Sequence, residues 1–179
     1  MSDAYLGLGS NIGNREENLV NAVIRVKKYC PLLEYSSMFM SSPVGYTEQS
    51  DFLNMVLKID ASRFAPHELL SLVKGIEHEM GREETFRWGP RLIDIDILYM
   101  DHAFISSDVL TIPHKELLNR LFVLVPLSEL TDSLQLENGM LHLEDRIGAL
   151  TRCAAGSIED MVKLFKSRDE LEFHAKKCH

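Results

Sequence analysis

Two aspartates placed two positions apart, Asp94 and Asp96, are the residues of this chain whose spacing most clearly suggests chemistry. They alternate with isoleucines, and alternate side chains of a β-strand share a face, so both carboxylates point to the same side. Two strand steps separate their Cα atoms by roughly 6–7 Å, so both carboxylates can reach one cation or a cation pair. Hard oxygen ligands suit Mg²⁺, which commonly completes its shell with phosphate and water. The spacing therefore predicts a magnesium site on one strand face.

The residues before this strand favour a phosphorylated ligand. Gly89 and Pro90 prevent a helix there. The irregular loop that results carries Arg87, Trp88 and Arg91, and planar guanidinium groups bind phosphate through paired hydrogen bonds. A half-buried strand with a solvated outer face would show the same alternation of isoleucine and aspartate, so the carboxylates alone leave both interpretations open. The arginines and the tryptophan favour the ligand site, because a solvated strand face does not require them.

Composition and charge narrow the class of protein. With 45% hydrophobic and 26% charged residues among 179, the chain resembles an ordinary globular domain, with or without an appendage. A net charge of −8 argues against general nucleic-acid binding, which needs a basic surface. Three scattered cysteines without Cys-x-x-Cys spacing fit a reducing cytoplasm and neither a disulfide framework nor a zinc site. No apolar run resembles a signal peptide or reaches transmembrane length, so we expect a cytoplasmic location and no membrane partner.

The elements that must position these residues follow a β-α-β-β-α-β order. Apolar patterns predict strands over residues 4–9, 33–40, 52–59 and 92–99. Helices are predicted over 15–28, opened by Asn14 and Glu17 as a capping box, and from Pro66 to Gly81. This order is typical of the ferredoxin-like α+β sandwich, in which two helices pack on one face of an antiparallel sheet.

Two connections of this order raise separate questions. Gly7-x-Gly9-x-x-x-Gly13 follows the first strand, but its spacing does not match the dinucleotide fingerprint, so we interpret it as a tight turn with close packing. The polar Pro/Gly loop over 41–50 is longer than a hairpin needs and is the kind of loop that carries binding residues. Asn54, within the third strand, needs a specific partner because an unpaired amide there would be costly.

The chain after residue 100 gives weaker signals. Residues 103–112 are consistent with a short hairpin, a short helix is predicted near Arg120, and residues 122–130 form an apolar stretch interrupted by Pro126. A second capping box at 157–160 predicts a C-terminal helix that includes Leu164 and Phe165. We expect a core domain over 1–130 and a C-terminal extension over 131–179, partly helical and either packed on the core or trailing from it.

Several short motifs occur in a characteristic order along residues 4–130. They are Gly9-Ser10-Asn11-x-Gly13, Ser42-Pro43-x-Gly45, Gln49-x-x-Phe52-x-Asn54, Glu77 with Gly81-Arg82, Arg87-Trp88-Gly89-Pro90-Arg91-x-x-Asp94-x-Asp96, Leu110-Thr111-x-Pro113-His114 and Arg120-x-Phe122. In this order they resemble the 6-hydroxymethyl-7,8-dihydropterin pyrophosphokinase family of folate biosynthesis. The resemblance implies a ferredoxin-like fold. It also implies transfer of pyrophosphate from ATP to the hydroxymethyl group of the pterin, giving AMP and the pterin diphosphate.

The resemblance also implies roles for individual residues. Asp94 and Asp96 would hold two Mg²⁺ ions between ATP and the substrate hydroxyl. With Arg82 and Arg91, which would pair with phosphates, they would form the catalytic set. Further residues implied in ATP binding are Lys74, Glu77, Trp88, Ile97, His114, Lys115 and Arg120. Those implied in pterin binding are Ser41, Pro43, Val44, Gly45, Phe52, Asn54, Trp88 and Phe122. The expected partners are the two small molecules, with no nucleic acid, and we expect a monomer.

Some positions leave alternatives open. Phe52 and Phe122 would sandwich the pterin ring, but by composition either is also consistent with a place in the hydrophobic core. Glu84 stands where the family commonly has an arginine, and Lys74 where a different polar residue is expected, which concerns ATP affinity more than the type of reaction. A ligand-binding or regulatory module of the same fold that has lost catalysis is the alternative function. It would not be expected to retain the carboxylates and arginines together.

Overall fold

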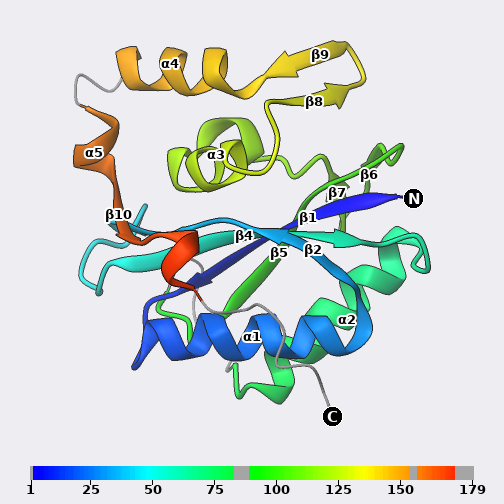
Figure 1. The fold of residues 1–179 in the computed structure, drawn as a ribbon, viewed down its shortest axis with the longest axis horizontal. Helices are drawn as coiled ribbons and strands as arrows, with labels where there is room; N and C mark the ends of the chain where they lie inside the picture. The colour runs from blue at the N-terminus through cyan, green and yellow to red at the C-terminus, as the bar shows by residue number, and fades with distance from the viewer. Residues whose placement is uncertain (1, 83–88, 154–156, 172–179) are drawn as a thin grey trace.

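A central antiparallel sheet positions the predicted site (Figure 1). This computed structural model describes residues 2–82, 89–153 and 157–171. Its main strands are β1 (Asp3–Ser10), β2 (Leu32–Tyr35), β3 (Met38–Ser41), β4 (Phe52–Asp60), β5 (Asp94–Met100) and β10 (Val162–Lys166). They are arranged in the order β10–β3–β4–β1–β5, with β2 also paired to β4. The order of elements through β5 confirms the predicted α+β class and the ferredoxin-like arrangement.

Two long helices cover one face of this sheet, α1 (Arg15–Tyr29) and α2 (Pro66–Glu79) (Figure 1). The predicted start of α1 is confirmed, because the Asn14 side chain accepts a hydrogen bond from the Glu17 N–H at 3.2 Å and donates one to the Glu17 carboxylate at 3.1 Å. Apolar side chains of both helices are buried against the sheet, among them Leu19, Leu69 and Ile76. These apolar contacts attach both helices to the sheet.

The end of α2 determines where Arg82 lies. Gly81 adopts a left-handed backbone at φ +85°, which favours glycine. Its N–H donates to the His78 carbonyl at 2.9 Å, and the Arg82 N–H donates to the Glu77 carbonyl at 3.0 Å. This pair of bonds is the Schellman arrangement that ends many helices. The chain changes direction at this point, and Arg82 therefore lies beside β5.

The opposite face of the sheet is covered by α3 (Leu121–Ser128) and α4 (Leu143–Cys153) (Figure 1). The sequence did not predict a helix over 122–130. Because α3 lies between the sheet and α4, apolar side chains on several of its sides are at least partly buried, and the stretch lacks the one-sided apolar pattern of a surface helix. Pro126 lies inside the helix. The short turn η1 (Leu117–Asn119) precedes it and corresponds to the predicted short helix near Arg120.

One predicted strand is in fact two. The stretch over 33–40 is broken between β2 and β3 at Ser36 and Ser37, which are both buried. The Ser36 hydroxyl accepts a hydrogen bond from the Val56 N–H at 2.9 Å, and the Ser37 N–H donates to the Glu129 carboxylate at 2.6 Å. Side chains thus replace part of the strand ladder, which explains the imperfect alternation in the sequence.

The C-terminal helix prediction was only partly correct. The capping box is confirmed, because the Asp160 N–H donates to the Ser157 hydroxyl at 3.2 Å, but α5 ends after four residues (Ile158–Met161). Leu164 and Phe165 lie instead in β10, which pairs with the open edge of β3. An available strand edge has overridden a local helical pattern.

The remaining elements are short. The predicted hairpin is confirmed as β6 (Ile105–Ser106) and β7 (Thr111–Ile112). A second hairpin, β8 (Ser133–Leu136) with β9 (Gly139–His142), leads into α4, and η2 (Arg168–Glu170) follows β10. Within the described ranges, no helix combines the length and the apolar character that crossing a bilayer requires.

Candidate active site

A cavity of about 120 Å³ opens on the face of the sheet that carries Asp94 and Asp96. Its floor is formed by β1, β4 and β5, and its walls by the loop after β3 and by the segment that leads into α3. The predicted site residues that line it are Ser41, Val44, Phe52, Asn54, Arg91, Asp94, Asp96, His114, Arg120 and Phe122. These residues are up to 81 positions apart in the sequence, and the fold brings them around one space.

The predicted alternation along β5 is confirmed. Ile93, Ile95 and Ile97 are buried on the side of α1 and α2, whereas the two aspartates face the cavity. Glycines of β1 stand opposite both carboxylates, Gly9 beside Asp94 and Gly7 beside Asp96. A Cβ at Gly7 would lie only 3.1 Å from the Leu98 side chain, so close packing explains this glycine.

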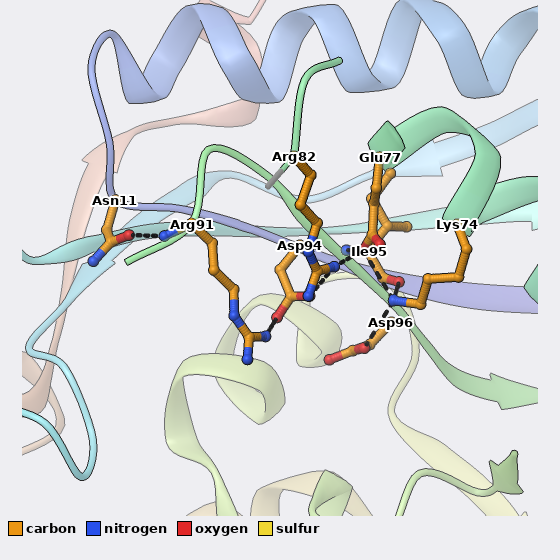
Figure 2. Close-up of polar contacts among 8 residues, drawn as sticks. All are labelled: Asn11, Lys74, Glu77, Arg82, Arg91, Asp94, Ile95 and Asp96. Carbon is orange, nitrogen blue, oxygen red and sulfur yellow. Dashed lines mark hydrogen bonds and ion pairs between the residues drawn. The ribbon is translucent and has the colours of Figure 1, made fainter. Parts of the chain in front are cut away.

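Asp94 is paired with two arginines (Figure 2). Its Oδ1 accepts from Nη1 of Arg82 at 2.8 Å, and its Oδ2 accepts a short hydrogen bond from Nη1 of Arg91. Burial alone would raise the pKa of Asp94, but the two guanidinium groups outweigh it and hold that pKa below the ordinary value. The Asp94 carboxylate thus offsets part of the positive charge of the two arginines.

Asp96 is in a different environment, although it lies only two residues away. Its nearest cation is the Lys74 ammonium, at 3.9 Å from Oδ1, and 37% of its side chain is exposed to the cavity. Desolvation within the cavity raises the pKa of Asp96, and the neighbouring charge of Asp94 raises it further. Asp96 therefore presents carboxylate oxygens that no arginine occupies among the described residues, as a metal ligand requires.

Next to the aspartates, the buried carboxylate of Glu77 connects α2 to β5 (Figure 2). It is 3% exposed, and its Oε1 accepts from the Ile95 N–H at 2.6 Å, from Lys74 at 2.9 Å and from Arg82 at 2.5 Å. Lys74 also donates to the Ile95 carbonyl at 3.1 Å. Glu77 thus fixes the two cations beside the aspartates, and in this state its own side chain lies behind them and outside the cavity lining.

Asn11 joins the site to two loops, and the sequence analysis did not single it out as a site residue. Its Oδ1 accepts from the Arg91 N–H at 2.7 Å, and its Nδ2 donates to the Gln49 side chain at 2.9 Å and to the Ser50 carbonyl at 3.2 Å. It is only 5% exposed. A polar residue in the Ser-Asn-x-Gly turn directly after a strand was the signal that could have identified it.

The other end of the cavity, called the neutral end below, is lined mainly by uncharged side chains, with Arg120 at its border. The predicted need of Asn54 for a specific partner is confirmed, because its Nδ2 donates to the Ser41 hydroxyl at 2.9 Å. Phe52 and Phe122 are half-buried and line the cavity, outside the fully buried core. The Arg120 guanidinium lies 5.7 Å from the centre of the Phe122 ring, within range of a cation–π contact.

His114 lies between the two ends. Burial lowers the pKa of His114, the charges of Arg120 and Lys115 lower it further, and Asp96 opposes them. Its Nδ1 accepts from the Glu116 N–H at 3.2 Å, so the proton of the neutral ring is assigned to Nε2. A neutral histidine in this position can donate one hydrogen bond.

Several predicted residues do not line the cavity. Ile97 is 3% exposed in the core, because strand alternation places it on the opposite face from Asp96, so only its backbone can meet a ligand. Lys115 is exposed, and Pro43 and Gly45 lie on the loop whose neighbours Ser42 and Val44 form the wall. The predictions for Trp88 and Glu84 fall on residues outside the described part of the chain.

The donor set fits Mg²⁺ only in combination with a phosphorylated ligand. Where the chain is described, no group of three or more aspartate, glutamate, histidine or cysteine side chains could hold a metal ion. Asp94 and Asp96 supply carboxylate oxygens on one face, and Mg²⁺ usually binds one or two carboxylates and takes its other ligands from phosphates and water. The residues therefore suit a metal that arrives with a nucleotide.

The chain matches the family described as 7,8-dihydro-6-hydroxymethylpterin-pyrophosphokinase over residues 5–132. A 2-amino-4-hydroxy-6-hydroxymethyldihydropteridine pyrophosphokinase of Bacillus subtilis is 43% identical over 136 residues, which are 75% of this chain and 81% of that protein. A protein of the same name from Aquifex aeolicus is 41% identical over 130 residues, which are 73% of this chain and 81% of that protein. A folic acid synthesis protein of Dictyostelium discoideum is 46% identical over 126 residues, which are 70% of this chain and 19% of that protein.

Solved structures share the fold at low sequence identity. A Plasmodium falciparum HPPK-DHPS triple mutant with SDX-DHP matches with a TM-score of 0.73 at 16% identity, over 91% of this chain and 47% of that chain. An HPPK-DHPS in complex with substrates matches with a TM-score of 0.72 at 14% identity, over 91% of this chain and 46% of that chain. The chain thus spans about half the length of these proteins and about a fifth of the Dictyostelium protein.

Proposed function

Since this chain belongs to the 7,8-dihydro-6-hydroxymethylpterin-pyrophosphokinase family, we propose that it transfers pyrophosphate from ATP to the hydroxymethyl group of 6-hydroxymethyl-7,8-dihydropterin. The products are AMP and the pterin diphosphate. The observation that carries the proposal is a single cavity with paired carboxylates and an arginine at one end, and two aromatic rings with a fixed amide at the other. The first end suits a triphosphate and the second a flat heterocycle.

The reaction demands positioning and neutralisation of charge. The hydroxyl oxygen of the pterin attacks the β-phosphorus of ATP, the bond from that phosphorus to the oxygen of the α-phosphate breaks, and the hydroxyl proton is released. Such a transfer needs no covalent catalyst, because alignment and charge stabilisation account for most of the rate. The protein therefore has to hold two substrates in line and keep water out.

Asp94 and Asp96 would hold the Mg²⁺ ions. When bound, these ions would neutralise charge on the attacking and leaving oxygens. Arg82 and Arg91, which now pair with Asp94, have guanidinium forks that match phosphate oxygens. On nucleotide binding they would pass from the carboxylate to the phosphates, which leaves Asp94 available to metal. His114 can donate Nε2–H to the same region.

The pterin would bind between Phe52 and Phe122. Offset stacking of aromatic rings contributes about 0.5–1.5 kcal/mol per contact beyond burial. Because the Nδ2 of Asn54 is already bonded to Ser41, its Oδ1 remains as an acceptor for an N–H of the ring edge. That oxygen lies next to Gly9, at 3.4 Å from the position that a Cβ would take there.

The test is incubation with ATP, Mg²⁺ and hydroxymethyl-dihydropterin, followed by separation of the nucleotides. We expect AMP and pterin diphosphate in equal amounts, no AMP when the pterin is omitted, and no reaction when EDTA removes the metal. Formation of ADP, or AMP that does not depend on the pterin, would contradict the proposal. Binding of both ligands without AMP would favour a ligand-binding module of the same fold.

A further inference from the structure

Besides apolar contacts, two hydrogen bonds from one side chain, Arg146, join the C-terminal part of the chain to the cavity wall that carries Arg120 and Phe122. The Arg146 Nε donates to the Leu118 carbonyl at 2.6 Å, and its Nη2 donates to the Asn119 side chain at 3.1 Å. Arg146 belongs to α4 and lies beyond residues 5–132, the part of the chain that matches the family. It reaches back across 28 positions to the turn η1.

The position of this turn determines where Arg120 and Phe122 lie. Arg120 follows η1 directly and is the N-cap of α3, with an extended backbone. Its carbonyl accepts from the N–H groups of Val123 and Leu124, both at 3.0 Å, which begins the helix. Neither Glu116 nor Arg120 caps its helix with a side-chain hydrogen bond. The turn has its own backbone bonds, from the Leu117 N–H to the His114 carbonyl at 2.8 Å and from the Asn119 N–H to the Glu116 carbonyl at 3.0 Å. The two bonds from Arg146 add a polar constraint from another helix.

Attachment of α4 to α3 does not need the guanidinium. Leu143 and Ile147, on the same helix, are buried in one apolar cluster with Leu117, Leu121 and Leu124. Burial of such side chains supplies most of the contact energy between helices. Hydrogen bonds from a charged donor have a defined geometry, so they fix the position of the backbone segment that accepts them.

We propose that Arg146 is a positioning residue, which holds the turn over 117–119 so that Arg120 and Phe122 face the cavity where nucleotide and pterin meet. Its effect on turnover rests on the proposed function, whereas its effect on the turn does not. We expect loss of both bonds to lower kcat/KM about tenfold, which corresponds to about 1.4 kcal/mol.

The first test measures the turn without any substrate. Amide hydrogen exchange at Val123 and Leu124 is compared in wild type, Arg146→Ala and Arg152→Ala. Arg152 is the matched control, because it is an exposed arginine on the same helix with no hydrogen bond or ion pair among the described residues. We expect about tenfold faster exchange at these amides in Arg146→Ala only. Equal exchange in both variants would overturn the proposal.

The second test measures turnover of the same proteins well below their melting temperatures. We expect kcat/KM to fall about tenfold in Arg146→Ala, to recover in part in Arg146→Lys, and to be unchanged in Arg152→Ala. The fall should be smaller in an Arg120→Ala background, because Arg146 acts partly through Arg120. A lower melting temperature with unchanged kinetics, or full additivity with Arg120→Ala, would overturn it. If wild type formed no AMP, the proposed function would fail, and the exchange comparison would still decide the role of Arg146.

Discussion

The two ends of the cavity are held in different ways. At the charged end, Asp94 and Glu77 are bonded to Arg82, Arg91 and Lys74, so the groups suited to phosphate and metal are engaged with one another. At the neutral end, the Asn54 amide is fixed by Ser41 and the two phenylalanines already line the cavity. If the proposed function holds, the charged end has to rearrange to receive its ligand, whereas the neutral end is preformed. Salt, pH and charge-removing substitutions should therefore act on the first end and leave the second largely unaffected.

The largest expected effect is on turnover at the charged end. Replacing Asp96 by Asn keeps the shape but removes an anionic oxygen ligand, so we expect kcat to fall by about a thousandfold or more. The melting temperature of the metal-free protein should be equal to or above that of wild type, because Asp96 lies beside another carboxylate. Asp108→Asn, at an exposed position, is the control and should change neither quantity. Turnover near wild type in Asp96→Asn would refute the metal assignment.

The next effect is on stability. In Glu77→Gln the buried carboxylate that accepts from Lys74, Arg82 and the Ile95 N–H loses its charge. We expect the free energy of unfolding to fall by about 2–3 kcal/mol, measured by urea denaturation. Glu79→Gln removes the charge of an exposed ion pair with Arg25 near the end of the same helix and should cost less than about 1 kcal/mol. Similar losses in both variants would show that Glu77 does not anchor the charged end.

A smaller effect should separate the two ligands. Phe122→Ala removes one stacking contact, which is worth about 0.5–1.5 kcal/mol beyond burial. It should therefore weaken pterin binding several-fold and leave binding of a non-hydrolysable ATP analogue nearly unchanged. Phe104→Ala, at an exposed position directly before β6 and outside the cavity lining, is the control. Equal losses for both ligands would mean that Phe122 supports the whole cavity and not the pterin in particular.

The smallest effect concerns pH and the two aspartates in the metal-free protein. The pKa of Asp94 is lowered on folding, so its charge stabilises the fold above about pH 4, and this contribution is lost as the pH falls through the lowered pKa. The pKa of Asp96 is raised, so its protonated form adds to the free energy of unfolding at low pH. This stabilisation is lost as the pH rises through the raised pKa. In a plot of the free energy of unfolding against pH, Asp94→Asn should reduce the slope below about pH 4, and Asp96→Asn should reduce it above about pH 4. Urea denaturation at a series of pH values on both sides of this point measures the curves. Curves identical to that of wild type would contradict the two pKa directions.

Features that depend on neighbouring residues could be predicted from the sequence, whereas features that depend on distant segments could not. The alternation along β5, the Asn14 cap and the need of Asn54 for a partner follow from residues near one another, and all are present. The pairing of β10 with β3 joins segments more than 120 positions apart and overrode a helical pattern. A local pattern cannot reveal such pairing, because it depends on which sheet edge remains open.

The same distinction applies to the candidate site. The charged residues of β5 and its preceding loop were predictable, because their spacing on one strand is itself the signal. Three further roles depend on contacts between elements. Glu77 binds Arg82 next to Asp94, Asn11 joins two loops, and Arg146 holds the turn before Arg120. The Ser-Asn-x-Gly turn could have marked Asn11 as a candidate, but no spacing rule along the chain specifies which residues any of the three contacts.

The central claim is that one cavity has a charged half for the nucleotide and a neutral half for the pterin. Calorimetric titration of wild type with a non-hydrolysable Mg²⁺–ATP analogue and, separately, with the pterin tests it most directly. When salt is raised from about 0.05 M to about 0.5 M, charge–charge attraction is increasingly screened. We predict that affinity for the nucleotide falls about tenfold or more, while affinity for the pterin changes less than about twofold. A fall in pterin affinity as steep as that for the nucleotide would contradict the account.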